Sequence, residues 1–208
     1  MDGSREGTVH WIPIHVLGLS NWLSSHLSRG KSVPGRTPKE AADTFVKFLQ
    51  ESLHCLSDHY LTAFQQSEKL YKIYYEPYAD LVSRDFTDYR ASITQIFRTV
   101  PDPQQAGQFK AKTQEYSYTL LNAGGQEIVS YHWHPNDPGV AYPHLHINER
   151  AIKRIHFPTS RVCIEDFIFM LFRDFDIRPN VSHAEYKRVL EKNKKSFEKW
   201  ATWKIQHQ

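Results

Sequence analysis

Residues 112–147 alternate between apolar and polar side chains in a way that is typical of β-strands. The run KTQEYSYTLL alternates, NAGG follows it at residues 122–125, and QEIVSYHWH alternates again. Two alternating runs around a short turn that contains glycine predict a β-hairpin. A second loop, PNDPGVAYP, separates this hairpin from HLHI, which we expect to be a third antiparallel strand.

Helical signals dominate our interpretation of the rest of the chain. Thr37 and Glu40 form a capping box, and apolar residues at helical spacing follow it toward residue 108, with an interruption at Pro77. After the strands, VCIEDFIFMLFRDF is apolar on most sides, and Ser182 and Glu185 form a second capping box. The predicted fold class is therefore α+β, with a helical N-terminal half, a small antiparallel β-meander of about three strands and two C-terminal helices.

The expected domain organisation follows from this change of pattern. Residues 1–108 form a mainly helical region and residues 109–208 an α+β region with the histidine-rich meander, either as two units or as one compact domain. Cys55 and Cys163 lack the spacing of a metal knuckle or a redox pair, so we expect buried thiols and a reducing compartment. No stretch approaches the roughly 18 apolar residues of a membrane span, and we expect a cytoplasmic protein.

Four histidines in two H-x-H pairs are the strongest functional signal: His132, His134, His144 and His146. Side chains of a strand alternate between the two faces of a sheet, so each pair shares one face. If His134 lies opposite His144, then His132 lies opposite His146. One face then carries four imidazoles, and the other carries apolar side chains suited to packing under helices.

Three further residues are candidates for the same site. One register of the first hairpin places Glu115 opposite His132, where a carboxylate would fix the tautomer of the imidazole. His156 and Arg161 lie in HFPTSR, directly before the predicted central helix. We expect Arg161 to hold a phosphate there, because a helix N-terminus also favours an anion.

Two kinds of chemistry fit such a face. Neutral imidazoles about 5 Å apart can hold a divalent transition metal such as zinc or manganese, with His132, His134, His144, His146 and His156 as candidate ligands. The same histidines could instead act without a metal, one as base and another as acid, in cleavage of RNA at its 2′-hydroxyl. A structural role for the histidines is the third interpretation.

The segment from residue 112 to residue 175 resembles the TumE-like toxins of bacterial toxin–antitoxin pairs. The resemblance is carried by Ser130, Tyr131, His132, Trp133, Pro143, His144 and His146. Those toxins are shorter, and they carry an aspartate–asparagine–alanine stretch where this chain has NDPGVAY. The resemblance implies a toxin- or defence-type activity on RNA, and an antitoxin as protein partner.

Three functions follow as hypotheses. The first is a toxin- or defence-type nuclease that acts on RNA through the catalytic residues His132, His134, His144, His146, Glu115 and Arg161. The second is a metal-binding enzyme that acts on a small molecule through the same histidines. The third is a non-catalytic subunit that binds a partner, such as an antitoxin, through its helical half.

Overall fold

The computed structural model describes residues 35–67, 69–75, 78–147 and 156–200. In chain order the described elements are α2 (Pro38–His54), β1 (Thr62–Ser67), β2 (Leu70–Tyr74), β3 (Ala79–Val82), β4 (Asp88–Pro101), β5 (Phe109–Asn122), β6 (Glu127–Trp133), β7 (His144–Ile147), β8 (Phe157–Pro158), α3 (Ile164–Asp174) and α4 (His183–Trp200). The strands form one antiparallel sheet in the order β1-β2-β4-β5-β6-β7-β8, and β3 pairs with β4.

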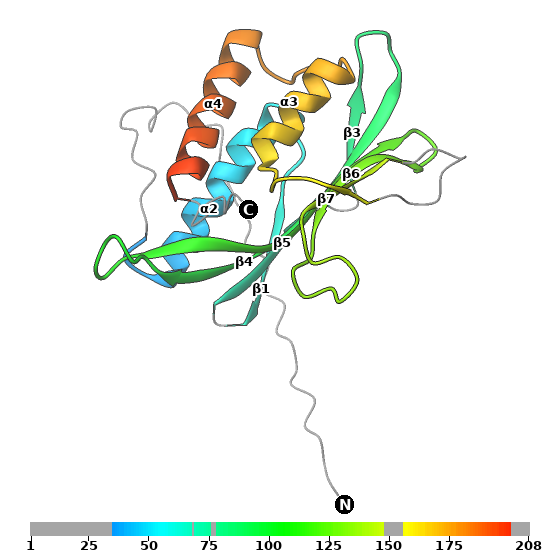
Figure 1. Cartoon of the computed structure of the whole chain (residues 1–208). Coiled ribbons are helices and arrows are strands. Elements are labelled where there is room, and N and C mark those ends of the chain that lie inside the picture. The colour runs from blue at the N-terminus through cyan, green and yellow to red at the C-terminus, as the bar shows by residue number, and fades with distance from the viewer. Residues whose placement is uncertain (1–34, 68, 76–77, 148–155, 201–208) are drawn as a thin grey trace, which may run out of the picture.

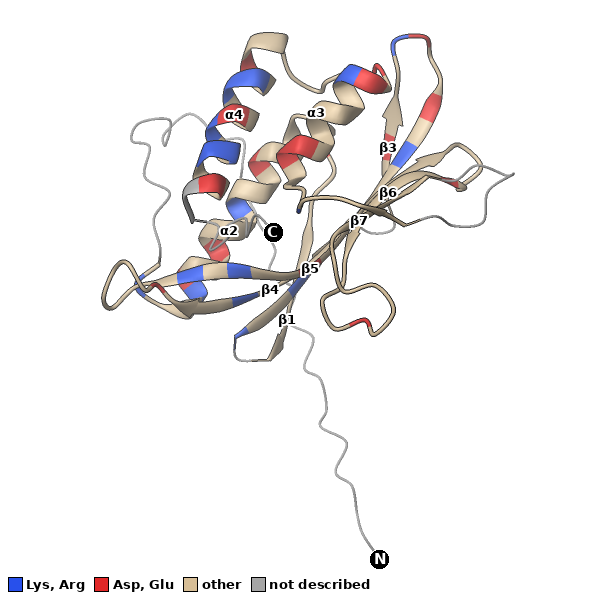
Figure 2. Ribbon diagram, in the orientation of Figure 1, with Lys and Arg blue, Asp and Glu red and all other residues tan. Residues whose placement is uncertain are grey.

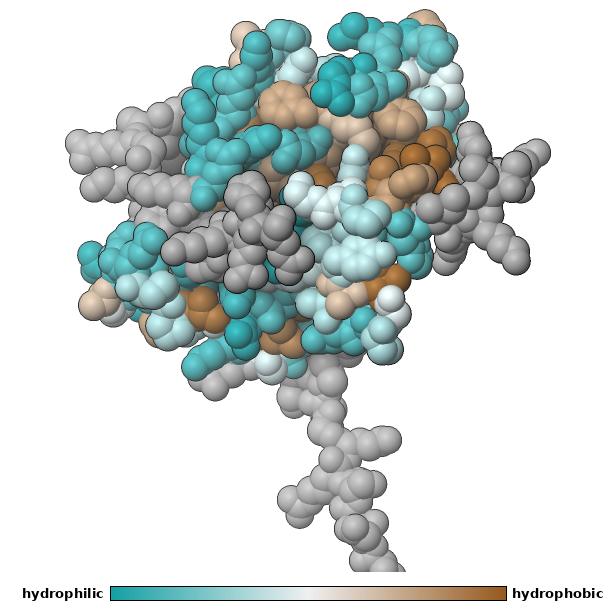
Figure 3. Space-filling model, viewed as in Figure 1, coloured by the Kyte–Doolittle hydropathy of each residue, from teal (hydrophilic) through white to brown (hydrophobic). Residues whose placement is uncertain are grey.

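The three described helices lie on one face of this sheet (Figure 1). The core fills the space between the two layers. Phe97 on β4 is fully buried there and contacts Phe45 of α2 and Tyr71 of β2, with ring centroids 4.7 and 5.1 Å apart. The outward side of α4 is hydrophilic in the view of Figure 3. No described helix covers the opposite face of the sheet, which carries the histidines.

The predicted helical N-terminal half is wrong, and so is the small meander of three strands. Among the described residues before 109, only α2 is a helix, and β1, β2, β3 and β4 fill most of the rest. The sheet has 8 strands. Residues 1–34 of the expected helical region lie outside the described residues.

The pattern on β4 explains this correction. Its buried side chains recur at every second position: Ala91, Ile93, Gln95, Phe97 and Thr99. Polar and β-branched residues alternate with them, as in a strand with one covered face. The same apolar residues also fit the helix expected from the sequence, because short stretches of mixed spacing satisfy both periods.

Other local predictions are confirmed. The side chain of Thr37 accepts a hydrogen bond from the backbone N–H of Glu40 at 3.1 Å, and α2 begins there. The hairpin of β5 and β6, the strand β7 and the helices α3 and α4 also lie where the sequence placed them. Both cysteines are free and buried, and burial raises the pKa of Cys55 to about 12.

The expected boundary at residue 108 falls between two strands that pair with each other. β4 and β5 are hydrogen-bonded along their length, from Tyr89 opposite Asn122 to Pro101 opposite Phe109. The division into two regions stays a prediction, but the sheet runs through both of them. None of the described helices is both long enough and apolar enough to span a bilayer.

Candidate functional site

The histidines gather on the face of the sheet that no described helix covers, where β6 and β7 pair. His132 lies directly opposite His144, and Ser130 lies opposite His146. The predicted register differs from this one by two residues. Because side chains repeat every two residues along a strand, that shift keeps all the histidines on the predicted face.

The opposite face of β6 is apolar, as expected. Val129 and Trp133 are buried there, and Tyr131 packs against the core from the same face. The apolar side chains of β6 therefore pack against the helical layer on one face, and the alternating histidines lie on the other.

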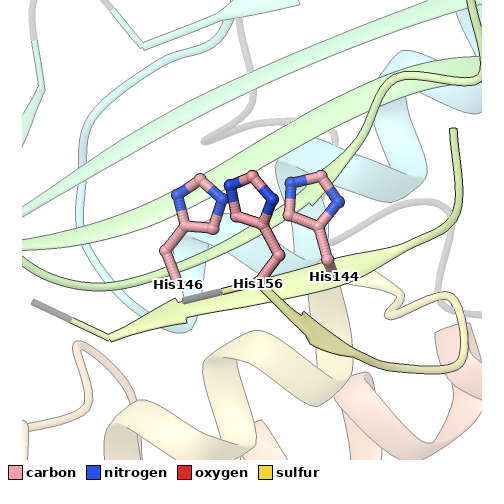
Figure 4. A group of neighbouring side chains, drawn as sticks. All are labelled: His144, His146 and His156. Atoms are coloured by element: carbon pink, nitrogen blue, oxygen red, sulfur yellow. The ribbon is translucent and has the colours of Figure 1, made fainter. Parts of the chain in front are cut away.

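Three of the imidazoles form a compact triad of His144, His146 and His156 (Figure 4). The ring of His156 lies 4.9 Å from that of His144 and 4.6 Å from that of His146, between centroids. Each residue offers one ring nitrogen, and these three atoms lie within 4.8 Å of one another. His144 and His146 are buried, and His156 is half-buried.

The triad matches what a transition metal requires. Zinc bonds imidazole nitrogen at about 2.0–2.1 Å, and a tetrahedral ion holds two such atoms roughly 3.4 Å apart, so small rotations of the rings would close the site. Nδ1 of His144 donates a hydrogen bond to the carbonyl oxygen of Tyr142 at 2.9 Å, which leaves Nε2 as the ligand atom. Nδ1 of His146 faces Oε1 of Glu127 at 3.8 Å, an arrangement that orients this second ring.

Glu127, His132 and His146 form a second group of potential ligand atoms among the described residues. Both ring nitrogens of His132 are already engaged, however. Its Nε2 is hydrogen-bonded to Oγ of Ser130, and its Nδ1 lies 3.0 Å from Nε2 of His134. A metal at this second position would have to displace one of these two hydrogen bonds, so the triad is the better candidate for a metal site.

A connected series of polar groups runs beside the triad. Thr119 contacts Ser130, Ser130 contacts His132, and His132 contacts His134. Nδ1 of His134 then faces Oε2 of Glu115 at 3.9 Å. An ionised Glu115 favours a proton on Nδ1 of His134, and this choice fixes every later donor and acceptor: His132 donates from Nδ1 and accepts at Nε2 from Ser130.

The predicted position of Glu115 needs the same two-residue correction. Ser117, not Glu115, lies opposite His132. Glu115 therefore contacts His134, and it sits at the open end of the series, where about one third of its side chain is exposed. The expected carboxylate–imidazole contact is present, but with the other histidine of the pair.

Arg161 does not join the histidines. Its guanidinium group lies 3.2 Å from the ring centroid of Trp133, which projects from the helix-covered face of β6. Burial lowers the pKa of Arg161 to about 10. The sequence placed Arg161 near the site because it is close to His156 along the chain, but the strand β8 lies between the two residues and the path to α3 crosses to the other face.

Three residues of the site were missed: Ser130, Thr119 and Glu127. Ser130 precedes His132 by two residues, so the alternation already placed it on the histidine face. Thr119 follows from the pairing of β5 with β6. Glu127 had no signal in the sequence, because a register shift between Leu120 and Leu121 sets its position.

Comparison of the chain with protein-family models, with curated proteins and with solved structures gives no match.

Proposed function

We propose that this chain is a metal-dependent enzyme that cleaves phosphodiester bonds of RNA, with the metal held by His144, His146 and His156. The observation that carries the proposal is the triad itself. Three imidazole nitrogens converge within 4.8 Å, and their residues are buried or half-buried. Three protein ligands leave a coordination position for water or substrate, as in catalytic zinc sites.

The imidazole of His134 supplies the acid–base group of the proposed site. Its ring centroid lies 6.4 Å from that of His144, and 37% of its side chain is exposed. Glu115 orients His134 from one side and His132 from the other. A positioned imidazole of this kind can take a proton from an attacking hydroxyl group or return one to a leaving group.

RNA as substrate and a toxin or defence role extend the resemblance of residues 112–175 to TumE-like toxins. A cytoplasmic location belongs to the same proposal, because both cysteines are free and buried. The antitoxin surface was expected on a helical N-terminal half, but the described residues of that half form one helix, α2, and four strands. The proposal therefore includes no surface for an antitoxin.

A small-molecule substrate is the second candidate, and one observation favours it. The carboxylates of Glu115 and Glu127 lie next to the histidines, at 3.9 Å from His134 and 3.8 Å from His146. Negative charge beside the metal disfavours an anionic polymer and suits a neutral or cationic molecule. Arg161, which was expected to neutralise a phosphate, lies over Trp133 instead.

Metal content and RNA cleavage, measured on the same proteins, test the proposal. Wild type is compared with His144→Ala/His146→Ala and with His183→Ala, which removes an exposed histidine on α4. We expect one transition metal per chain in wild type and in the His183 variant, and none in the double variant. RNA cleavage should follow metal content and stop with a chelator.

Other outcomes would redirect or end the proposal. Metal without RNA cleavage would move the assignment to a small-molecule substrate. Cleavage that persists in the chelator-treated protein would replace the metal with acid–base catalysis by the histidines. Absence of both metal and cleavage in wild type would reject the enzyme assignment.

A further inference from the structure

The histidine site is one end of a continuous row of side chains across the face of the sheet that no described helix covers. The row is defined by the strand registers, in which each residue lies opposite the next: Thr62, Tyr74, Thr94, Ser117, His132 and His144. From Tyr74 to His132 there are three interstrand spacings, roughly 14 Å. The side chains between them, Thr94 and Ser117, are small and half-buried.

The end of the row away from the histidines is aromatic. Phe64 on β1 and Tyr74 on β2 stack with ring centroids 5.3 Å apart and an angle of 16° between their planes. Both residues are half-buried on the face that no described helix covers. Aromatic side chains on a sheet face are the usual surface on which unpaired bases stack.

Three cations extend from this aromatic pair along the same face: Lys72 on β2, Arg98 on β4 and Lys112 on β5. Arg98 lies opposite Lys112, and Lys72 lies opposite Ile96, two residues from Arg98 on the same face. Arg98 and Lys112 are exposed, Lys72 is half-buried, and none of the three forms an ion pair with another described residue. Figure 2 shows Lys and Arg gathered on this part of the sheet.

Two acidic residues on the same face contact other side chains. Asp80 pairs with Arg90 at 3.3 Å, and Glu115 faces His134. Glu115 lies opposite Ile96, which lies opposite Lys72, so this carboxylate borders the cations on the side of the histidines. Three cations beside one carboxylate leave the part of the face around Phe64 and Tyr74 net positive.

We propose that the surface formed by Phe64, Lys72, Tyr74, Arg98 and Lys112 binds single-stranded RNA and leads it across Thr94 and Ser117 to the histidine site. The cations contact backbone phosphates and the aromatic pair stacks a base. A single strand fits because its bases are free to stack, whereas a duplex hides them. The choice of RNA over DNA as the ligand rests on the proposed function. The binding of a single-stranded nucleic acid to this surface rests on its aromatic and cationic residues alone.

The same arrangement accounts for the negative charge near the metal triad. Lys72, Arg98 and Lys112 hold phosphates away from Glu127 and from the triad, and their three charges exceed that of Glu115 beside them, so the affinity for RNA does not depend on the histidine end. Only the phosphate at the triad approaches the carboxylates, and there a bound cation would compensate for their charge.

The test is binding of a fluorescein-labelled 2′-O-methyl oligouridylate, which cannot be cleaved at its 2′ position, followed by fluorescence anisotropy. The variants are Lys72→Ala/Arg98→Ala/Lys112→Ala and Tyr74→Ala. The matched control is Lys187→Ala/Arg188→Ala/Lys195→Ala, which removes the same charge from exposed positions on α4. The charge-conserving variant Lys72→Arg/Arg98→Lys/Lys112→Arg shows whether an effect comes from lost charge or from damaged folding.

We expect the triple sheet variant to bind at least 10-fold more weakly than wild type. Three lost phosphate contacts to a single strand should also reduce the slope of log K against log salt by about 2. Tyr74→Ala should weaken binding by about 5-fold or more through lost stacking. The α4 control and the charge-conserving variant should bind as wild type does.

The proposal is overturned if wild type does not bind the oligonucleotide, or if the triple sheet variant binds as tightly as wild type. It is also overturned if the α4 control loses as much affinity, or if a DNA oligothymidylate of equal length binds more tightly than the RNA. Failure of the proposed function looks different, because RNA would then bind with the expected dependence on these residues and remain uncleaved. If the sheet variants cleave RNA as fast as wild type does, the proposed binding surface is rejected and the proposed function stands.

Discussion

The imidazole of His156 stacks on that of His146, with ring centroids 4.6 Å apart and planes 12° from parallel. His146 belongs to β7, and His156 precedes β8, which pairs with β7. Antiparallel pairing thus adds a third histidine to the H-x-H pair of β7, and the triad of His144, His146 and His156 results.

Replacement of His156 by alanine should therefore weaken metal binding far more than replacement of His132. The first change removes a ligand, and we expect the Kd for Zn²⁺ to rise by more than ~100-fold, beyond the range typical of residues that only support a ligand. The second removes a ring whose nitrogens already bond to Ser130 and His134. Titration with Co²⁺ followed by visible absorbance, with Zn²⁺ competition, measures both. A larger loss for the His132 variant would place the metal among Glu127, His132 and His146.

Glu115 should fix the tautomers of His134 and His132. With Glu115 ionised, both imidazoles carry their proton on Nδ1, whereas free imidazole prefers Nε2. Imidazole ¹⁵N spectra of neutral, metal-free protein should show the Nδ1–H form at both residues. Glu115→Ala should abolish this preference at His134, and Glu127→Ala, the matched control near His146, should preserve it. An Nε2–H form of His132 in wild type would contradict the assigned direction of the series.

Glu165 should make the protein less stable as the pH rises. It is buried at the start of α3, where Ser52 donates a hydrogen bond to it at 2.7 Å, and burial raises the pKa of its carboxyl group above 4.5. Between the unfolded and folded pKa values the unfolded chain loses the proton first, so stability is complete below that window and falls as the pH passes through it.

Glu165→Gln removes this dependence. The variant should gain stability over wild type at neutral pH, and the gain should shrink as the pH falls toward 4.5, the value for an unperturbed glutamate. Urea unfolding of both proteins across that range gives the comparison. A constant difference at all pH values would show that the carboxyl group does not titrate differently in the folded protein.

Phe97 should be among the residues that stabilise the protein most. It is fully buried between α2 and the sheet, so Phe97→Ala leaves a cavity and should cost about 3–5 kcal/mol of unfolding free energy. Phe86, which is 75% exposed in the turn after β3, is the matched control, and its replacement by alanine should change stability by less than about 0.5 kcal/mol. Chemical denaturation monitored by circular dichroism distinguishes the two. Similar values would mean that the sheet and α2 do not share one core.

The sequence by itself determined those elements whose local, repeating signals are strong. The alternation around residues 112–147 gave the hairpin, the strand β7 and the face on which the histidines lie, because a period of two is unambiguous over a long run. The capping residues Thr37 and Ser182 marked the starts of α2 and α4, since a cap depends only on its neighbours along the chain.

Tertiary structure decided the rest. The segments that form β1, β2, β3 and β4 carry apolar spacing that suits both a helix and a strand, and only their pairing within a large sheet made them strands. The register of β5, β6 and β7 also depends on pairing, and it moved Glu115 from His132 to His134. Side-chain alternation fixes the sheet face on which each residue lies. It does not fix the residue opposite it on the neighbouring strand, because a register shift of two residues keeps the same face. For that reason the histidine face and its candidate ligands could be predicted, whereas the grouping of His144, His146 and His156 and the position of Arg161 could not.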